Sequence, residues 1–217
     1  MTLSIVQSMS IWGSSAGATV SYHSATTGGN LLLAFATNNF SEGPILTPSS
    51  WTQVFQANSG VEGGLWYKYT SGGETSSTWR DTDGGDNIAV AIYEIHGADP
   101  SDPIDQYSYN GSYEYSTPVT PTVVGDLALG TAFVNSIPSG AAYITPAGWV
   151  NDCFQSNIGS YHGLTAGHQT LLTTDTSTPI NPTFSWGGDS GMTVVVLIQP
   201  PTGGPPPGPP IPSFMVV

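Results

Sequence analysis

The stretch Gly29–Phe35 (GNLLLAF) decides the fold, because its pattern returns in the second half of the chain as Gly125–Thr131 (GDLALGT). Three more pairs of segments match in the same order: Leu46–Trp51 with Ile144–Trp149, Gly64–Leu65 with Gly163–Leu164, and Gly84–Asn87 with Gly187–Ser190. Matches that keep one order along a chain are typical of an internal repeat. The sequence therefore predicts a duplicated unit, with halves at about 1–98 and about 116–199.

The repeated segments have the composition of β-strands. Leu31–Ala36 and Val194–Ile198 are short, apolar and bounded by glycine or proline, as buried strands are. Leu65–Tyr69 is rich in aromatic residues, which favours a half-exposed strand. A single half would leave one apolar face open. We therefore expect an all-β sandwich over residues 1–199 in which two sheets cover each other, rather than two independent domains.

The composition excludes several classes of partner. Hydrophobic residues make up 38% and charged residues only 8% of the 217 residues, whereas soluble domains usually have about 25% charged residues. Lys68 and Arg80 are the only basic residues, and the formal net charge is -13. Such a chain cannot neutralise nucleic-acid phosphates and is repelled by anionic membranes. With Cys153 as the single cysteine, neither an internal disulfide nor a cysteine zinc site can form.

The beginning of the chain predicts where the protein is made. Met1–Gly13 has neither a basic region nor a continuous apolar run, so we expect no signal peptide and synthesis in a host cytoplasm. No stretch of the chain is apolar enough to span a bilayer. A surface poor in charge and rich in Ser, Thr and Gly is nevertheless typical of outward-facing proteins. A virion component satisfies both expectations.

A tyrosine-rich segment lies between the two halves. It places Tyr107 and Tyr109 before Asn110-Gly111, and Tyr113 and Tyr115 after it. Asn-Gly favours a two-residue hairpin turn, because both positions tolerate positive φ. The tyrosines then form either an exposed contact or ligand surface or an edge hairpin with one face packed on the core.

The chain changes character at Pro200. Residues 200–212 are mostly proline and glycine, which predicts an extended polyproline-like arm. The arm carries an apolar tip: Ile211, Phe214, Met215, Val216 and Val217. Such a tip suits a peptide that docks on a neighbouring subunit, and the alternative is a frayed terminus.

Two segments resemble sites of known chemistry. Asp81, Asp83 and Asp86 alternate with glycine and threonine as in a calcium loop, but the bidentate glutamate of an EF-hand is missing, so an acidic turn is the alternative. Gly188–Gly191 (GDSG) resembles the nucleophile loop of chymotrypsin-like serine proteases. The only histidine loop, at His168, lies in the same half, and the repeat assigns GDSG to a turn. We expect no catalytic residues, no cofactor beyond calcium and no enzyme activity.

The chain as a whole resembles a module of bacteriophage virion proteins and bacterial surface proteins. The resemblance covers about residues 1–200 and rests on the following segments: Gly29–Phe35, Thr47–Val54, Gly64–Tyr69, Ala89–Asp99, Gly125–Leu127, Ala166–Gln169 and Val195–Pro200. It implies a jelly-roll-like sandwich used in capsid decoration, in a tail or in adhesion.

Two functions follow from these observations. The first is a non-enzymatic virion structural protein, for capsid decoration or in a minor tail position, that forms a homo-oligomer and contacts other capsid or tail subunits. The second is a carbohydrate-binding module for host-surface recognition, which uses the surplus of aromatic and amide side chains. For a third, a glycan-processing enzyme, the carboxylates are too scattered to nominate a catalytic pair.

Overall fold

The computed structural model describes residues 2–13, 17–38, 43–58, 61–82, 87–111, 117–135, 146–157, 162–170, 178–183 and 190–201. Within these ranges the chain forms strands and no helix, which confirms the predicted all-β class. None of the described elements is a helix that is long and apolar enough to cross a membrane.

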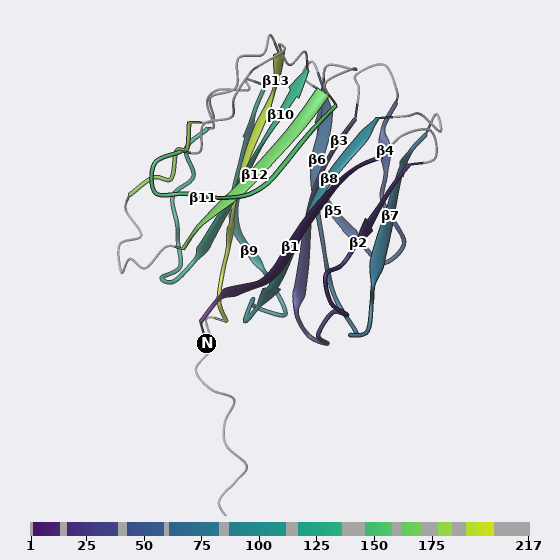
Figure 1. Ribbon diagram of the computed structural model, residues 1–217. Coiled ribbons are helices and arrows are strands. Elements are labelled where there is room, and N and C mark those ends of the chain that lie inside the picture. Colours follow the sequence, from purple (N-terminus) through teal and green to yellow (C-terminus); the bar gives the residue numbers. More distant parts are fainter. Residues whose placement is uncertain are drawn as a thin grey trace, which may run out of the picture.

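The strands form three layers, which Figure 1 shows nearly edge-on. Sheet 1 has five strands in the order β1-β8-β3-β6-β5, and a small sheet in the order β2-β7-β4 lies beside it. The strands of sheet 1 are β1 (Ser4–Gly13), β3 (Leu31–Asn38), β5 (Thr52–Asn58), β6 (Glu62–Tyr69) and β8 (Ile88–His96). The small sheet contains β2 (Ala18–Ser21), β4 (Ile45–Leu46) and β7 (Ser76–Asp81).

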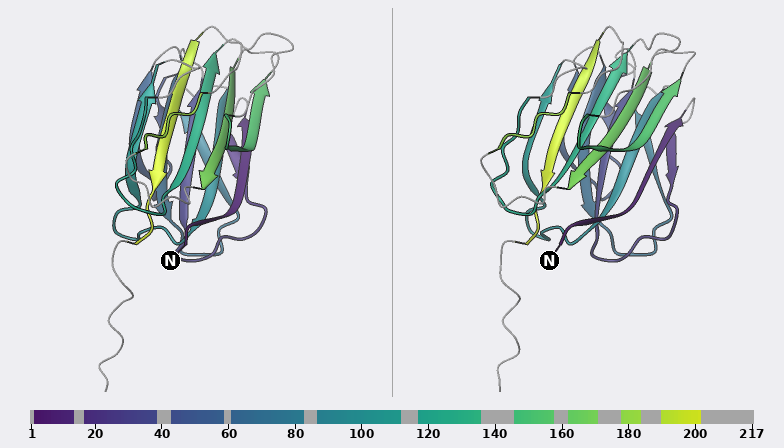
Figure 2. Two further views of the ribbon diagram at one scale, coloured as in Figure 1. Left: turned by 90° about the vertical axis from the view of Figure 1, so that its left-hand side faces the viewer. Right: turned by 60° about the vertical axis from the view of Figure 1, so that its left-hand side comes forward.

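Sheet 2 faces sheet 1 on the side away from the small sheet (Figure 2). Its order is β11-β12-β10-β13-β9, and every neighbouring pair is antiparallel. The strands are β9 (Ile104–Asn110), β10 (Leu127–Asn135), β11 (Val150–Asn157), β12 (His162–Thr170) and β13 (Ser190–Ile198). β9 contains Tyr107 and Tyr109, so this part of the tyrosine-rich segment is an edge strand of sheet 2.

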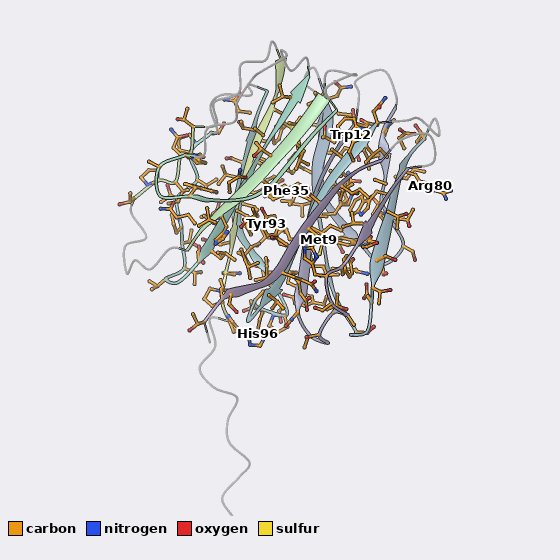
Figure 3. All side chains as sticks on the ribbon, in the orientation of Figure 1. Met9, Trp12, Phe35, Arg80, Tyr93 and His96 are labelled. Atoms are coloured by element: carbon orange, nitrogen blue, oxygen red, sulfur yellow. The ribbon has the colours of Figure 1, made fainter. Side chains whose placement is uncertain are left out.

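The small sheet explains why the central strand of sheet 1 is apolar on both faces. Leu31, Leu33 and Phe35 of β3 point into the core between the two large sheets, where Phe35 meets Tyr93 edge-on at 6.3 Å (Figure 3). Leu32 on the opposite face packs under the small sheet. A strand that is covered on both faces has no polar side, so its sequence reads as a continuous apolar run. The sequence predicted two layers and missed this third one.

The two large sheets share their hydrogen-bonding register. Leu31 of β3 is paired with Ile95, and Leu127 of β10 is paired with Ile198. Counting from these pairs, β1 and β9 each carry a bulge at the same place, at Val6 and at Asp105. A second pair of bulges, one in β5 and one in β11, also lies at equivalent places in the two sheets.

The second pair of bulges lies in β5 at Val54 and in β11 at Asp152, opposite equivalent residues of β6 and β12. The register corrects one sequence match. Gly64 faces Ala36 and corresponds to Thr165, two residues beyond the Gly163 that the sequence comparison had paired with it.

The order of strands bears on the jelly-roll prediction. In a jelly roll, the chain builds two sheets from two interlocked Greek keys. Here, all strands of the first half lie in sheet 1 or the small sheet, and β9 to β13 stay in sheet 2. The jelly-roll detail is therefore not confirmed by this strand order.

Candidate binding groove

A groove runs between the edge strands β5 and β9, where the two large sheets meet on one side of the sandwich. Its volume is about 400 Å³. The lining residues come from β5, β6 and β9 and from the loop that precedes β9: Thr52, Gln53, Val54, Tyr67, Asp102, Pro103, Ile104, Asp105, Gln106 and Tyr107. Aromatic, amide and carboxylate groups thus share one open surface.

Three stacked rings form one side of this region. Phe55 of β5 is nearly fully buried, and its ring is parallel to those of both Tyr107 and Tyr109 of β9. The ring centroids of Phe55 lie 5.5 Å from Tyr107 and 5.0 Å from Tyr109. We call these three residues the tyrosine stack. The tyrosines still expose 41% and 48% of their surface, so their rings remain accessible to a ligand.

The alternation of β9 produces the tyrosine stack. Residues two apart on a strand point to the same face, and Tyr107 and Tyr109 are two apart. The sequence analysis named both tyrosines as a candidate contact surface. It did not predict Phe55, because the pairing of β5 with β9 across the sandwich depends on how the two sheets pack. Tyr113 and Tyr115 lie outside the described residues.

Carboxylates gather at the end of the groove where β9 begins at Ile104, which we call its lower end. Asp105 accepts a hydrogen bond from the backbone N–H of Thr122 at 2.6 Å and one from the Thr122 hydroxyl. Asp126 is 1% exposed, and its carboxyl group pairs with that of Asp105, while neither of its oxygens accepts a hydrogen bond from a described N–H or hydroxyl group. Burial, followed by the hydrogen bond to Asp105 and then by the negative charge of Asp105, raises the pKa of Asp126 to about 8.

The residues that lead to the proline-rich arm are anchored beside the same groove. The backbone N–H of Gln199 donates to the carbonyl of Pro103 at 3.0 Å, and the carbonyl of Gln199 accepts from the N–H of Asp99 at 3.0 Å. The side-chain amide of Gln199 donates to the carbonyl of Asp102 at 2.6 Å. Asp102 and Pro103 also line the groove, so the arm begins at its lower end.

A second hollow lies on the outer face of sheet 2. It has a volume of about 500 Å³ and is lined in part by Trp149, Gln169 and Asn181. Trp51, which has the equivalent position in the first half, is 7% exposed and packs against Trp79 at 5.0 Å. The small sheet covers Trp51, whereas in the described part of the second half only the bridge between Val119 and Ile180 lies in the corresponding place. Trp51 is therefore a core residue, whereas Trp149 is only half-buried.

Most of the remaining candidate residues lie outside the described ranges. Asp81 is buried at the end of β7, and Asp83 and Asp86 lie outside the described residues, so the calcium loop stays a prediction. Within the described ranges, no group of three or more His, Cys, Asp or Glu residues is arranged to hold a metal ion. The docking residues Ile211, Phe214, Met215, Val216 and Val217 also lie outside these ranges.

The protease-like residues are far apart. His168 pairs with Asp152 at 2.7 Å, which is the kind of contact that orients a catalytic histidine. Ser190, however, is opposite Asn135 on β10, while His168 is opposite Leu129. Six residues of strand separate these positions, about 20 Å at 3.3 Å per residue. Ser190 and His168 therefore cannot act on one substrate atom.

No protein-family model, no curated protein and no solved structure matches the chain.

Proposed function

We propose that the chain is a non-enzymatic structural protein of a bacteriophage virion, used in capsid decoration or in a tail, whose arm at residues 200–217 docks on neighbouring subunits. The anchoring of Gln199 carries this proposal. Three hydrogen bonds hold the chain to the sandwich up to the first proline of the arm, and Pro200 itself is buried. An arm with a fixed starting point loses less conformational entropy on docking than one that frays from the last strand.

The charge distribution agrees with a role between protein surfaces. Lys68 is paired with Glu74 and lies 5.3 Å from the ring of Trp51, which leaves Arg80, exposed on β7, as the other cation (Figure 3). A surface with this balance does not attract nucleic acid. The arm is uncharged, so the acidic sandwich of a neighbouring copy does not repel it.

The internal duplication belongs to the same proposal. Matching strand orders, registers and two matching bulges support an origin of the two sheets from one ancestral unit. Their packing resembles an isologous dimer fused into one chain, since edge strand β1 lies against β11 and its counterpart β9 lies against β5. A unit that already paired with itself suits a protein that coats a surface in many copies.

The test is binding to assembled particles. Particles produced without this protein are incubated with the full chain or with a variant that ends at Pro201, and the bound protein is measured after sedimentation. We expect the full chain to bind and the shortened variant to lose binding while keeping its melting temperature. Equal binding of both would refute the docking role of the arm.

A second candidate, a carbohydrate-binding module, is favoured by the tyrosine stack beside Gln53 and Gln106. Exposed aromatic faces next to amide side chains are the groups that stack on and hydrogen-bond to sugars. A glycan array tests this candidate. Binding that disappears in Tyr107→Ala and Tyr109→Ala variants would support it, and an array without signal would remove it.

A further inference from the structure

We propose that the groove between β5 and β9 is the acceptor for the proline-rich segment 205–212 of a second copy of this chain. This inference rests on the proposed docking function and names the surface on which the arm docks. It joins two features that the sequence analysis treated separately, the tyrosine-rich segment and the arm.

The chemistry of the two surfaces is complementary. Polyproline segments bind grooves lined by aromatic rings, because flat proline rings pack on aromatic faces and the extended conformation is already ordered before binding. Tyr67 and Tyr107 line the groove, and Tyr109 extends the aromatic surface along β9. The arm supplies Pro205–Pro207, Pro209, Pro210 and Pro212.

The polar groups of the groove supply the hydrogen-bond donors that the arm lacks. Proline has no N–H, so a polyproline segment presents carbonyl acceptors that need donors. The side-chain amides of Gln53 and Gln106 are donors, as are tyrosine hydroxyls. The carboxylates of Asp102 and Asp105 would repel an acidic peptide, but the arm carries no charge.

The dimensions agree as well. Eight residues, 205–212, extend about 25 Å in a polyproline helix at 3.1 Å per residue. The seven residues of β9 extend about 23 Å at 3.3 Å per residue. The segment can therefore follow β9 from one end to the other.

The direction of the chain selects a second copy over the same copy. β13 is antiparallel to β9 and ends beside Ile104, so the chain leaves at the lower end of the groove and moves away from Tyr107. Entering its own groove would require the chain to reverse within the three residues Thr202–Gly204. Pro200 and Pro201 oppose such a reversal, since proline fixes φ and favours an extended residue before it. Reciprocal exchange of arms between two copies gives a closed dimer, and one-way exchange gives a larger assembly.

Sedimentation of the full-length protein over a wide range of concentration tests this proposal. We expect self-association that is weakened at least about tenfold, or about 1.4 kcal/mol, in the double variant Tyr107→Ser/Tyr109→Ser. A synthetic peptide with the sequence of residues 202–213 should compete and dissociate the assemblies, whereas a peptide with its prolines replaced by alanine should not. Val150→Ser, an exposed apolar residue on the opposite edge strand, is the matched control and should associate as the wild type does.

The outcomes distinguish failure of the groove assignment from failure of the proposed docking function of the arm. If removal of the arm abolishes self-association and the double tyrosine variant does not, the arm docks elsewhere and the groove assignment fails. If the chain is monomeric at every concentration, docking on a second copy fails while docking on other virion subunits survives. If the tyrosine variant loses glycan binding but keeps its self-association, the groove is a sugar site and the present inference is wrong.

Discussion

Asn30 and Asp126 occupy the same position in the two large sheets, each directly before the central strand, and their hydrogen bonding differs. The Asn30 side-chain amide donates to Glu94 Oε1 at 2.7 Å, and its oxygen lies 3.1 Å from His96 Nδ1. The Asp126 side chain pairs with the carboxyl group of Asp105 and accepts no hydrogen bond from a described amide. The register explains the difference, because Leu197 stands in sheet 2 where Glu94 stands in sheet 1. Sheet 2 therefore has no acid at this position of β13, and the acid beside Asp126 is Asp105 at the bulge of β9.

The substitution Asp126→Asn should stabilise the protein at neutral and alkaline pH. The pKa of Asp126 is raised from 3.8 to about 8 in the folded state. The unfolded chain therefore ionises near pH 4 while the folded protein holds its proton, and stability falls as the pH rises from about 4 to about 8. Asparagine cannot ionise, and its amide can donate to Asp105 as Asn30 donates to Glu94. We expect a gain of about 1–3 kcal/mol at pH 8, of the order of one hydrogen bond to a charged group, and little change at pH 4, where Asp126 is protonated in the folded protein.

Urea unfolding measured across this pH range checks the prediction. Asp102→Asn serves as the control, because Asp102 is exposed in the loop before β9 and its substitution should leave the pH profile unchanged. A variant Asp126→Asn whose free energy of unfolding falls with pH as steeply as that of the wild type would show that Asp126 ionises freely.

A buried carboxylate with three donors distinguishes sheet 1. Glu94 is fully buried and accepts hydrogen bonds from the side chains of Gln7 and Asn30 and from the backbone N–H of Thr27. Glu94→Leu introduces the residue type that sheet 2 has at the equivalent position, Leu197. The substitution removes the carboxylate that accepts these three hydrogen bonds. We expect a loss of more than about 3 kcal/mol, since hydrogen bonds to charged groups contribute about 1.5–3 kcal/mol each. Glu74→Leu, which removes only the partly exposed ion pair with Lys68, should cost about 0–1 kcal/mol.

The sequence predicted what depends on local pattern and missed what depends on packing. Apolar runs bounded by glycine identified the central strands, and repeated motifs matched segments that now have equivalent registers, such as Gly29–Phe35 and Gly125–Thr131. The small sheet was missed because β2 and β4 contain only four and two residues and carry little periodicity. The sequence identified only some of the aromatic residues at the groove. Tyr107 and Tyr109 are close in sequence, but Phe55 contacts them only because the two sheets pack together.

The same limit applies to the tryptophans. Trp51 and Trp149 follow the same Thr-Pro motif, and their equivalence in sequence favours one role for both. Their surroundings differ because the cover over Trp51 is a three-stranded sheet, and the described cover near Trp149 is a single bridge. Equivalent residues keep equivalent burial only where the layer above them is also repeated.

This difference predicts unequal costs of substitution. Trp51→Ala removes a buried ring that packs on Trp79, and a loss of about 3–5 kcal/mol is expected for a large core side chain. Trp149→Ala should cost clearly less, because part of this ring already faces the hollow on sheet 2. Thermal unfolding of the two variants under one condition compares them directly. Equal losses would mean that Trp149 is as well packed as Trp51.

The two large sheets are in close contact where Gly63 of β6 faces Phe133 of β10. A Cβ atom added to Gly63 would lie 2.5 Å from Cδ2 and 2.7 Å from Cε2 of the Phe133 ring, well inside van der Waals contact. Phe133 is fully buried, so its ring has little space into which to move. Gly63→Ala should therefore destabilise the protein by about 1–3 kcal/mol, the usual cost of overpacking a core.

A double-mutant cycle shows whether this clash is the cause. Phe133→Leu alone opens a cavity and should also destabilise, but it removes the ring atoms that the new methyl group would meet. We therefore expect Gly63→Ala to cost less in the Phe133→Leu background than in the wild type, with a coupling of at least about 0.5 kcal/mol between the two sites. Additive losses would place the strain of Gly63→Ala in the backbone of β6 instead, and the two sheets would then be less closely packed at this point than the Gly63–Phe133 distance implies.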